Sequence, residues 1–213
     1  MSKALDALAV LKEGNARYVE GTSLYDPAFN AVERSQLLEG QSPIAIVLGC
    51  SDSRVPVEMV FDQGFGDLFV IRVAGNIVAP SQIASVEFAV ETFGVKLVIV
   101  MGHTNCGAVA ATIEALTKNI QPESLGSLSS IVDRIRPAIE GLLNLNLTKD
   151  QLMEQAVRSN TRISSNALRH GSQSLERMAA EDNLLIISAE YCLETGKVDF
   201  FDGVPTDADG ISL

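Results

Sequence analysis

Two cysteines and one histidine stand at the ends of two segments that have the composition of buried strands. Cys50 comes directly after residues 44–49, and His103 and Cys106 follow residues 97–102. Because the carboxyl ends of parallel strands lie at one edge of a sheet, we expect the three side chains to meet there. Two thiolates and one imidazole leave the fourth tetrahedral position of a zinc ion open, which is the pattern of a catalytic zinc site rather than of a structural one.

Each half of this pattern also has a simpler interpretation. A cysteine at the end of a strand is often a small buried apolar residue, and a single His-x-x-Cys pair arises by chance. A disulfide is possible in principle, but the chain has three cysteines, an odd number without a disulfide framework. The metal interpretation therefore depends on both halves together, because three of the five cysteines and histidines of the chain fall in these two loops.

A carboxylate and a guanidinium follow Cys50 closely. Asp52 can accept a hydrogen bond from a water molecule on the metal, and Arg54 can hold that carboxylate ionised through a two-pronged hydrogen bond. Without the neighbouring cysteines and histidine, a loop-capping aspartate and a solvent-exposed ion pair would be the better interpretation. With them, we interpret Asp52 and Arg54 as catalytic residues.

Hydrophobic periodicity predicts an α/β fold with a mainly parallel central sheet of four to five strands flanked by helices. The first four strand segments are continuous apolar runs, as expected of strands that are covered on both faces. The predicted strands are residues 44–49, 68–73, 96–101, 184–189 and 197–201. The predicted helices are residues 2–19, 30–39, 81–93, 106–117, 127–144 and 150–181, with a loop at 118–126.

Length and charge narrow the class of protein. All 213 residues fit one domain, in which residues 1–40 form an N-terminal helical arm. The net charge of −11 argues against nucleic acid and anionic membranes as partners, because phosphate groups are bound by lysine and arginine. We find neither a secretory signal nor an apolar run near the roughly 18 residues of a membrane span. Free thiols that bind metal suit a reducing compartment, so we expect a cytoplasmic protein.

The two motifs together resemble the signature of the β-class carbonic anhydrases. Residues 50–54 (Cys-Ser-Asp-Ser-Arg) and 103–107 (His-Thr-Asn-Cys-Gly) carry the resemblance, and residues 61–76 match the same family between them. Residues 191–196, with the pattern Tyr-x-x-x-Thr-Gly, resemble the last strand pair of the family. The resemblance begins at about Gln41 and reaches the C-terminus, and it is densest in the first half of that stretch.

The resemblance implies a zinc enzyme that hydrates carbon dioxide reversibly to bicarbonate and a proton by zinc-bound hydroxide. It assigns one Zn²⁺ per chain to Cys50, His103 and Cys106, and it makes Asp52 and Arg54 the catalytic dyad. In some members of the family the aspartate swings onto the zinc in a closed, inactive state, so Asp52 is also a candidate fourth ligand. The implied partners are carbon dioxide and bicarbonate, and the implied assembly is a homodimer or a dimer of dimers.

Further residues are assigned to substrate binding. The resembled family has a glutamine at the position of Gln41 that reaches the substrate across a dimer interface, although Gly-Gln-Ser-Pro is also ordinary turn composition. Phe69 and Ala74, together with Val78, are candidates for an apolar wall beside a small neutral gas. Gly107 opens the helix after the metal loop, where backbone N–H groups can face an anionic product.

Some members of the resembled family also hold bicarbonate in a side pocket made by a tryptophan, an arginine and a tyrosine. Arg72 and Tyr191 match the arginine and the tyrosine, but Val47 stands at the tryptophan position and the chain has no tryptophan. A pocket without its indole lacks a hydrogen-bond donor and a packing wall. We therefore expect bicarbonate inhibition through this pocket to be weak or absent.

Two alternatives to carbon dioxide hydration stay open at this point. Carbonyl sulfide and carbon disulfide are nearly isosteric with carbon dioxide, so the same scaffold could hydrolyse them. A non-catalytic zinc-binding protein with a filled fourth position is the other alternative, against which the Asp52–Arg54 pair argues. Outside the two motifs, we interpret Cys192 as a packed core residue and His170 as a helix C-terminal residue favoured by the helix dipole.

Overall fold

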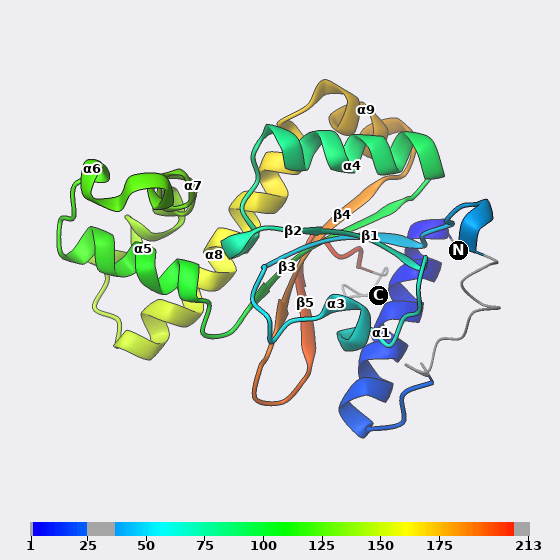
Figure 1. The fold of residues 1–213 in the computed structure, drawn as a ribbon, viewed down its shortest axis with the longest axis horizontal. Helices are drawn as coiled ribbons and strands as arrows, with labels where there is room; N and C mark the ends of the chain where they lie inside the picture. The colour runs from blue at the N-terminus through cyan, green and yellow to red at the C-terminus, as the bar shows by residue number, and fades with distance from the viewer. Residues whose placement is uncertain (1, 25–36, 207–213) are drawn as a thin grey trace.

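The computed structural model describes residues 2–24 and 37–206 and places five strands in one sheet (Figure 1). The strands are β1 (Ala45–Gly49), β2 (Leu68–Arg72), β3 (Leu97–His103), β4 (Leu185–Tyr191) and β5 (Val198–Asp202). They lie in the order β2-β1-β3-β4-β5, in which the first four pair in parallel and β5 pairs with β4 in an antiparallel hairpin. The predicted α/β fold with a mainly parallel sheet is therefore confirmed.

Helices cover both faces of this sheet. The α-helices are α1 (Lys3–Glu20), α3 (Val57–Val60), α4 (Pro80–Phe93), α5 (Gly107–Thr117), α6 (Pro122–Leu125), α7 (Ser129–Ile139), α8 (Lys149–His170) and α9 (Gln173–Glu181). Short 3-10 turns occur at η1 (Leu37–Glu39), η2 (Ala74–Asn76), η3 (Gly126–Leu128) and η4 (Leu142–Asn144). In Figure 1, α4 and α9 lie above the sheet, α1 and α3 lie below it, and α5, α6 and α7 form a group to its left.

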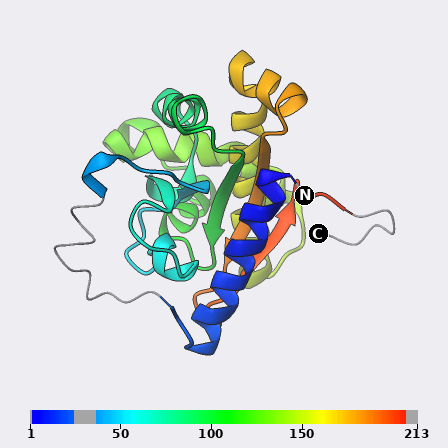
Figure 2. The ribbon, with the colours of Figure 1, turned by 90° about the vertical axis from the view of Figure 1, so that its right-hand side faces the viewer.

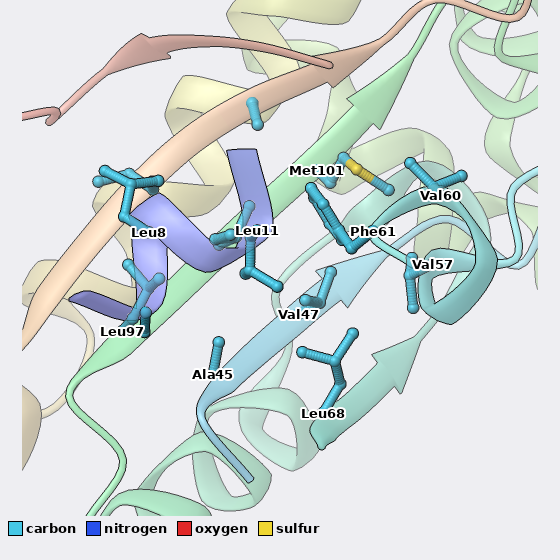
Figure 3. Packing of buried hydrophobic residues seen from close by; sticks show 14 of the residues in the cluster. Leu8, Leu11, Ala45, Val47, Val57, Val60, Phe61, Leu68, Leu97 and Met101 are labelled. Atoms are coloured by element: carbon cyan, nitrogen blue, oxygen red, sulfur yellow. The ribbon is translucent and has the colours of Figure 1, made fainter. Parts of the chain in front are cut away.

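Helix α1 packs along the sheet of its own chain (Figure 2). Ser2 caps its N-terminus, and Gly21, in the left-handed conformation with φ of 69°, ends it. Leu8 and Leu11 lie on one face of the helix and are fully buried in the same apolar cluster as Val47 of β1 (Figure 3). The helix thus covers one face of the sheet, and its reach toward a partner subunit stays a prediction.

The opposite face of the sheet carries the alternate residues of the same strands. Ile46 and Leu48 of β1 point away from Val47 and pack in a second cluster with Val86 of α4 and Leu168 of α8. A third cluster lies beyond the carboxyl ends of the strands, among α5, α7 and α8. Because β1 is buried on both faces, its residues form the continuous apolar run that predicted it.

The helical half of the chain differs from the prediction in where its helices end. The predicted helix 150–181 is divided into α8 and α9 at Gly171 and Ser172. The Ser172 hydroxyl accepts hydrogen bonds from two backbone N–H groups of the first turn of α9, so it caps a new helix at this point. The predicted helix 127–144 consists of α7 between two 3-10 turns, and the predicted loop 118–126 contains α6.

Two further differences concern the first part of the chain. The short helix α3, which carries Val57 and Val60 into the core, was not predicted. The predicted helix 30–39 lies mostly outside the described residues, and its last three residues form the turn η1. Within the described part of the chain, we find no helix with the length and apolar content needed to cross a membrane.

Candidate active site and metal centre

The carboxyl ends of β1 and β3 bring the three predicted ligands together. The two strands are parallel neighbours with Gly49 opposite Met101, so Cys50 begins its loop beside the end of β3. His103 is the last residue of β3, which is two residues longer at this end than predicted, and Cys106 is the N-cap of α5. All three side chains are buried, and their donor atoms lie within 4.8 Å of one another.

The imidazole of His103 is oriented by the backbone of its own loop. Nδ1 lies 2.9 Å from the carbonyl oxygen of Thr104, so Nδ1 carries the proton and donates it. Nε2 is buried and has no hydrogen-bond partner among the described residues, a situation that costs roughly 1–3 kcal/mol for a polar group. A metal ion held by Nε2 would remove this cost, and two sulfurs with one imidazole nitrogen are donors that zinc prefers. The residues present therefore fit a zinc ion.

The two cysteines have opposite acidities. The pKa of Cys50 is lowered to about 4, chiefly because the Cys106 thiol hydrogen-bonds to its thiolate, with further help from the Gly75 N–H at 3.3 Å from Sγ. The same thiolate, together with burial, raises the pKa of Cys106. A pair of thiols with opposite shifts shares one proton, and a divalent cation that binds both sulfurs displaces that proton.

Gly75 is a residue of this site that the sequence analysis did not single out. It lies in the turn η2 after β2, with φ of 70°. A Cβ atom here would lie 2.7 Å from Cδ1 of Ile135 and 3.0 Å from Cβ of Ala108, so a side chain is excluded by both conformation and space. The sequence signal that could have identified Gly75 was its position within residues 61–76, which match the resembled family.

Asp52 and Arg54 form the pair that the sequence analysis expected. Nε and Nη2 of Arg54 donate to the two carboxylate oxygens of Asp52 at 2.9 and 2.8 Å, and the Arg54 backbone N–H adds a third hydrogen bond at 3.0 Å. The Arg54 hydrogen bonds hold the pKa of Asp52 well below its usual range. Oδ2 of Asp52 lies 3.8 Å from Nε2 of His103, so an ionised carboxylate stands beside the cluster of donors.

Comparisons with known proteins agree with this geometry. The family model for carbonic anhydrase matches residues 45–198. A β-carbonic anhydrase of Aspergillus fumigatus has a crystal structure that superposes with a TM-score of 0.72 at 28% identity, over 96% of this chain and 93% of that one. The chain belongs to the β-carbonic anhydrase family. Members of the family are zinc enzymes, and their general reaction is the hydration of carbon dioxide.

Other β-carbonic anhydrases extend the similarity over nearly the whole chain. A carbonic anhydrase of Mycolicibacterium smegmatis is 37% identical over 203 residues, which is 93% of this chain and 93% of the relative. A structure titled as one of two tetrameric β-carbonic anhydrases of Sordaria macrospora has a TM-score of 0.70 at 22% identity, over 92% of this chain and 97% of that one. At 22% identity, the similarity to the Sordaria macrospora structure shows the fold alone.

Arg72 and Tyr191, which match the bicarbonate side pocket of some family members, make hydrogen bonds to other groups in this β-carbonic anhydrase. Nε and Nη2 of Arg72 donate to the carbonyl oxygens of Cys50 and Asp52, at 3.0 and 2.6 Å. The hydroxyl of Tyr191 lies 3.1 Å from that of Tyr18, and Arg72 and Tyr191 are on strands separated by β1 and β3. Arg72 thus holds the backbone of the loop that follows β1, and its role toward bicarbonate stays a prediction.

The candidate substrate residues are distributed unevenly around the donors. Ala74 precedes Gly75, and Gly107 is the first residue of α5, so both adjoin the metal cluster along the chain. Phe69 packs on the α4 face of the sheet, where its ring centroid is 6.2 Å from that of Phe88. Gln41 is exposed and precedes β1, at the end of the strand opposite to Cys50. Within one chain, Phe69 and Gln41 therefore lie away from the donors.

The remaining histidine and cysteine lie outside this cluster. His170 is the last residue of α8, as predicted, with Nδ1 at 3.2 Å from the carboxylate of Glu176. Cys192 was interpreted as a packed core residue, and this is wrong because its side chain is half-buried. It follows the end of β4 in the hairpin turn, where hydrogen bonding to Thr195 lowers the pKa of the thiol.

Proposed function

We propose that this chain hydrates carbon dioxide to bicarbonate and a proton, with one zinc ion per chain held by Cys50, His103 and Cys106. The observation that carries the proposal is the buried cluster of their donor atoms, in which Nε2 of His103 finds no hydrogen-bond partner in the part of the chain that the structure describes. An ionised carboxylate stands beside this cluster, at Asp52. A donor set of two thiolates and one imidazole leaves one zinc position for water, which is what a hydrating enzyme needs.

Zinc, when bound, lowers the pKa of a coordinated water molecule and so makes a nucleophile available near neutral pH. Two thiolates neutralise the charge of the ion, so the protein has to assist this ionisation. The Asp52 carboxylate would accept a hydrogen bond from the nucleophilic water or hydroxide. This contact would direct a lone pair of the nucleophile toward the carbon atom of the substrate. Arg54 keeps the carboxylate ionised and fixed through its two-pronged contact.

The chain also provides for the anionic product. Gly107 begins α5, so the first backbone N–H groups of this 11-residue helix lie directly after the ligand Cys106. The N-terminus of a helix carries a partial positive charge, which favours an anion such as bicarbonate. Arg54 adds a cationic group on the same side, where its Nη2 lies 3.4 Å from the carbonyl oxygen of Asn105.

The proposed function is tested by metal analysis combined with a stopped-flow hydration assay. We expect one zinc per chain and rapid hydration of carbon dioxide, with much slower hydrolysis of carbonyl sulfide and carbon disulfide measured in parallel. Zinc without hydration activity would instead support a non-catalytic zinc protein. Faster turnover of a sulfur-containing substrate would support the hydrolase alternative.

We also propose a cytoplasmic location, because metal-binding thiols need a reducing compartment.

We further propose that the protein works as a homodimer or a dimer of dimers. Large apolar side chains are exposed on the surface of the single chain, among them Met59 at 57%, Phe65 at 55% and Phe88 at 52%. Gln41 can serve the substrate only from a partner subunit, because it lies at the opposite end of β1 from its own Cys50. The tetrameric relatives from Sordaria macrospora share the fold.

Sedimentation equilibrium tests the proposed assembly. We expect a species of twice or four times the chain mass at micromolar concentration, because covering exposed aromatic side chains stabilises association. Gln41→Ala should leave that mass unchanged while lowering the rate of hydration. A stable and fully active monomer would contradict the proposal.

A further inference from the structure

Asn160 connects helix α8 to the turn that contacts the metal centre. It is 1% exposed and lies in the middle of α8, among apolar residues that include Val157. Its Nδ2 donates a hydrogen bond of 2.8 Å to the carbonyl oxygen of Gly75. Gly75 in turn donates its N–H to Sγ of Cys50 at 3.3 Å. One side chain of α8 is therefore two hydrogen bonds away from a candidate metal ligand.

Both backbone polar groups of Gly75, its N–H and its carbonyl, are held by hydrogen bonds. Its N–H contacts Cys50, its carbonyl contacts Asn160, and Ile135 and Ala108 leave no room for a side chain. A glycine with φ of 70° has access to many other backbone conformations, so its orientation has to be fixed by its neighbours. The hydrogen bond from Asn160 supplies that restraint at the carbonyl, and it thereby sets where the adjoining N–H points.

The fold alone does not account for an asparagine at this position. Asparagine is a weak helix former, and Oδ1 of Asn160 is buried with no hydrogen-bond partner within residues 2–24 and 37–206, which lowers stability. Nearby Ser165 is also buried, but its hydroxyl pairs with the hydroxyl of Ser188 at 2.8 Å. A leucine at position 160 would remove the unpaired Oδ1, but it would also take away the donor that pairs with the Gly75 carbonyl oxygen. The asparagine at this position is therefore best explained by the hydrogen bond that its side-chain N–H donates to the Gly75 carbonyl.

We infer that Asn160 is a positioning residue of the metal centre, which orients Gly75 so that its N–H stabilises the Cys50 thiolate. This inference builds on the proposed function, because it concerns the properties of a zinc ligand. An N–H group directed at a ligating sulfur stabilises the negative charge of the thiolate and fixes the sulfur in place. Groups that support ligands in this way commonly contribute 10–100-fold to metal affinity or activity.

Two substitutions and one matched control test the inference. Asn160→Leu removes the donor and the unpaired acceptor together while keeping a side chain of similar size, and Asn160→Ala removes both with a residue that favours the helix. Ser165→Ala is the control, because it removes a buried hydrogen bond of the same helix that does not lead to the metal ligands. The readouts are zinc release to a chelator, the thiolate-to-metal charge-transfer band of the Co²⁺-substituted protein, and thermal unfolding.

We expect both Asn160 variants to release zinc about 10–100-fold faster than the wild type and to shift the charge-transfer band. Ser165→Ala should lower the unfolding temperature and leave zinc release and the band unchanged. Should Asn160→Leu fail to fold, Asn160→Ala carries the test. Zinc release and a band within twofold of the wild type in the folded Asn160 variants would overturn the inference alone. A wild type that takes up no zinc would instead overturn the proposed function, and the inference with it.

Discussion

Replacing Cys106 by alanine is expected to leave the protein with little zinc and no measurable hydration of carbon dioxide. Cys106 is 1% exposed and supplies one of only three protein donors in the cluster. Loss of a supporting group around a metal costs about 10–100-fold in affinity, and loss of a ligand itself costs more, so we expect zinc affinity to fall by over roughly 100-fold. Metal analysis after dialysis against a weak chelator measures the effect directly.

Cys192→Ala is the matched control for this experiment. Cys192 is the third cysteine of the chain, and it stands in the turn after β4, outside the cluster of donors. We expect this variant to keep one zinc per chain and full activity. Circular dichroism should show that both variants fold, because a cysteine-to-alanine change removes a single sulfur atom. Full zinc occupancy in Cys106→Ala would show that the ligand assignment is wrong.

The meeting of Cys50 with His103 and Cys106 could be predicted because each motif directly follows a strand that is buried on both faces. Such strands are continuous apolar runs, and polar residues at their carboxyl ends gather at one edge of a parallel sheet. The last strand pair, around residues 191–196, followed from the family resemblance, but its antiparallel direction came from the structure. In these segments, local composition and tertiary structure agree.

Gly75 and Asn160 could not be predicted, because their relation to the site comes from tertiary structure. Gly75 reaches Cys50 because β2 pairs with β1 in the register that sets Gly49 opposite Arg72. Asn160 is 85 residues away from Gly75 in the sequence, on a helix whose rotation no local pattern fixes. A single polar residue in an amphipathic helix predicts an exposed position as readily as a buried contact.

The side of the sheet on which Phe69 lies had to come from the structure. Successive residues of a strand alternate between faces, so a shift of one residue in the register would have moved Phe69 from the α4 face to the α1 face.

The division of residues 150–181 into two helices had a local sequence signal, which the hydrophobic periodicity obscured. Gly171 and Ser172 are the residues that end one helix and cap the next, but the apolar pattern continues across them.

The second large effect is expected for Asp52→Asn, which should keep its zinc and lose most of its activity. The three ligands are untouched, so metal content should stay at one ion per chain. The amide cannot act as an anionic acceptor, and its contact with Arg54 changes from a charge-assisted pair of hydrogen bonds to a weaker neutral one. Groups that accept or deliver protons in this manner contribute about 10²–10⁴-fold, so we expect kcat/KM to fall by roughly 100-fold or more.

The dependence of this loss on pH separates a role for the ionised carboxylate from a general disturbance of the site. Arg54 holds the pKa of Asp52 well below its usual range of about 4, so the wild-type carboxylate stays ionised at every pH above that range. The deficit of Asp52→Asn should therefore be present throughout the neutral and alkaline range. Asp133→Asn makes the same change in an exposed ion pair with Arg136 on α7 and should have no effect. Equal activity of Asp52→Asn and the wild type, or a deficit confined to alkaline pH, would rule out the dyad that we assign to Asp52 and Arg54.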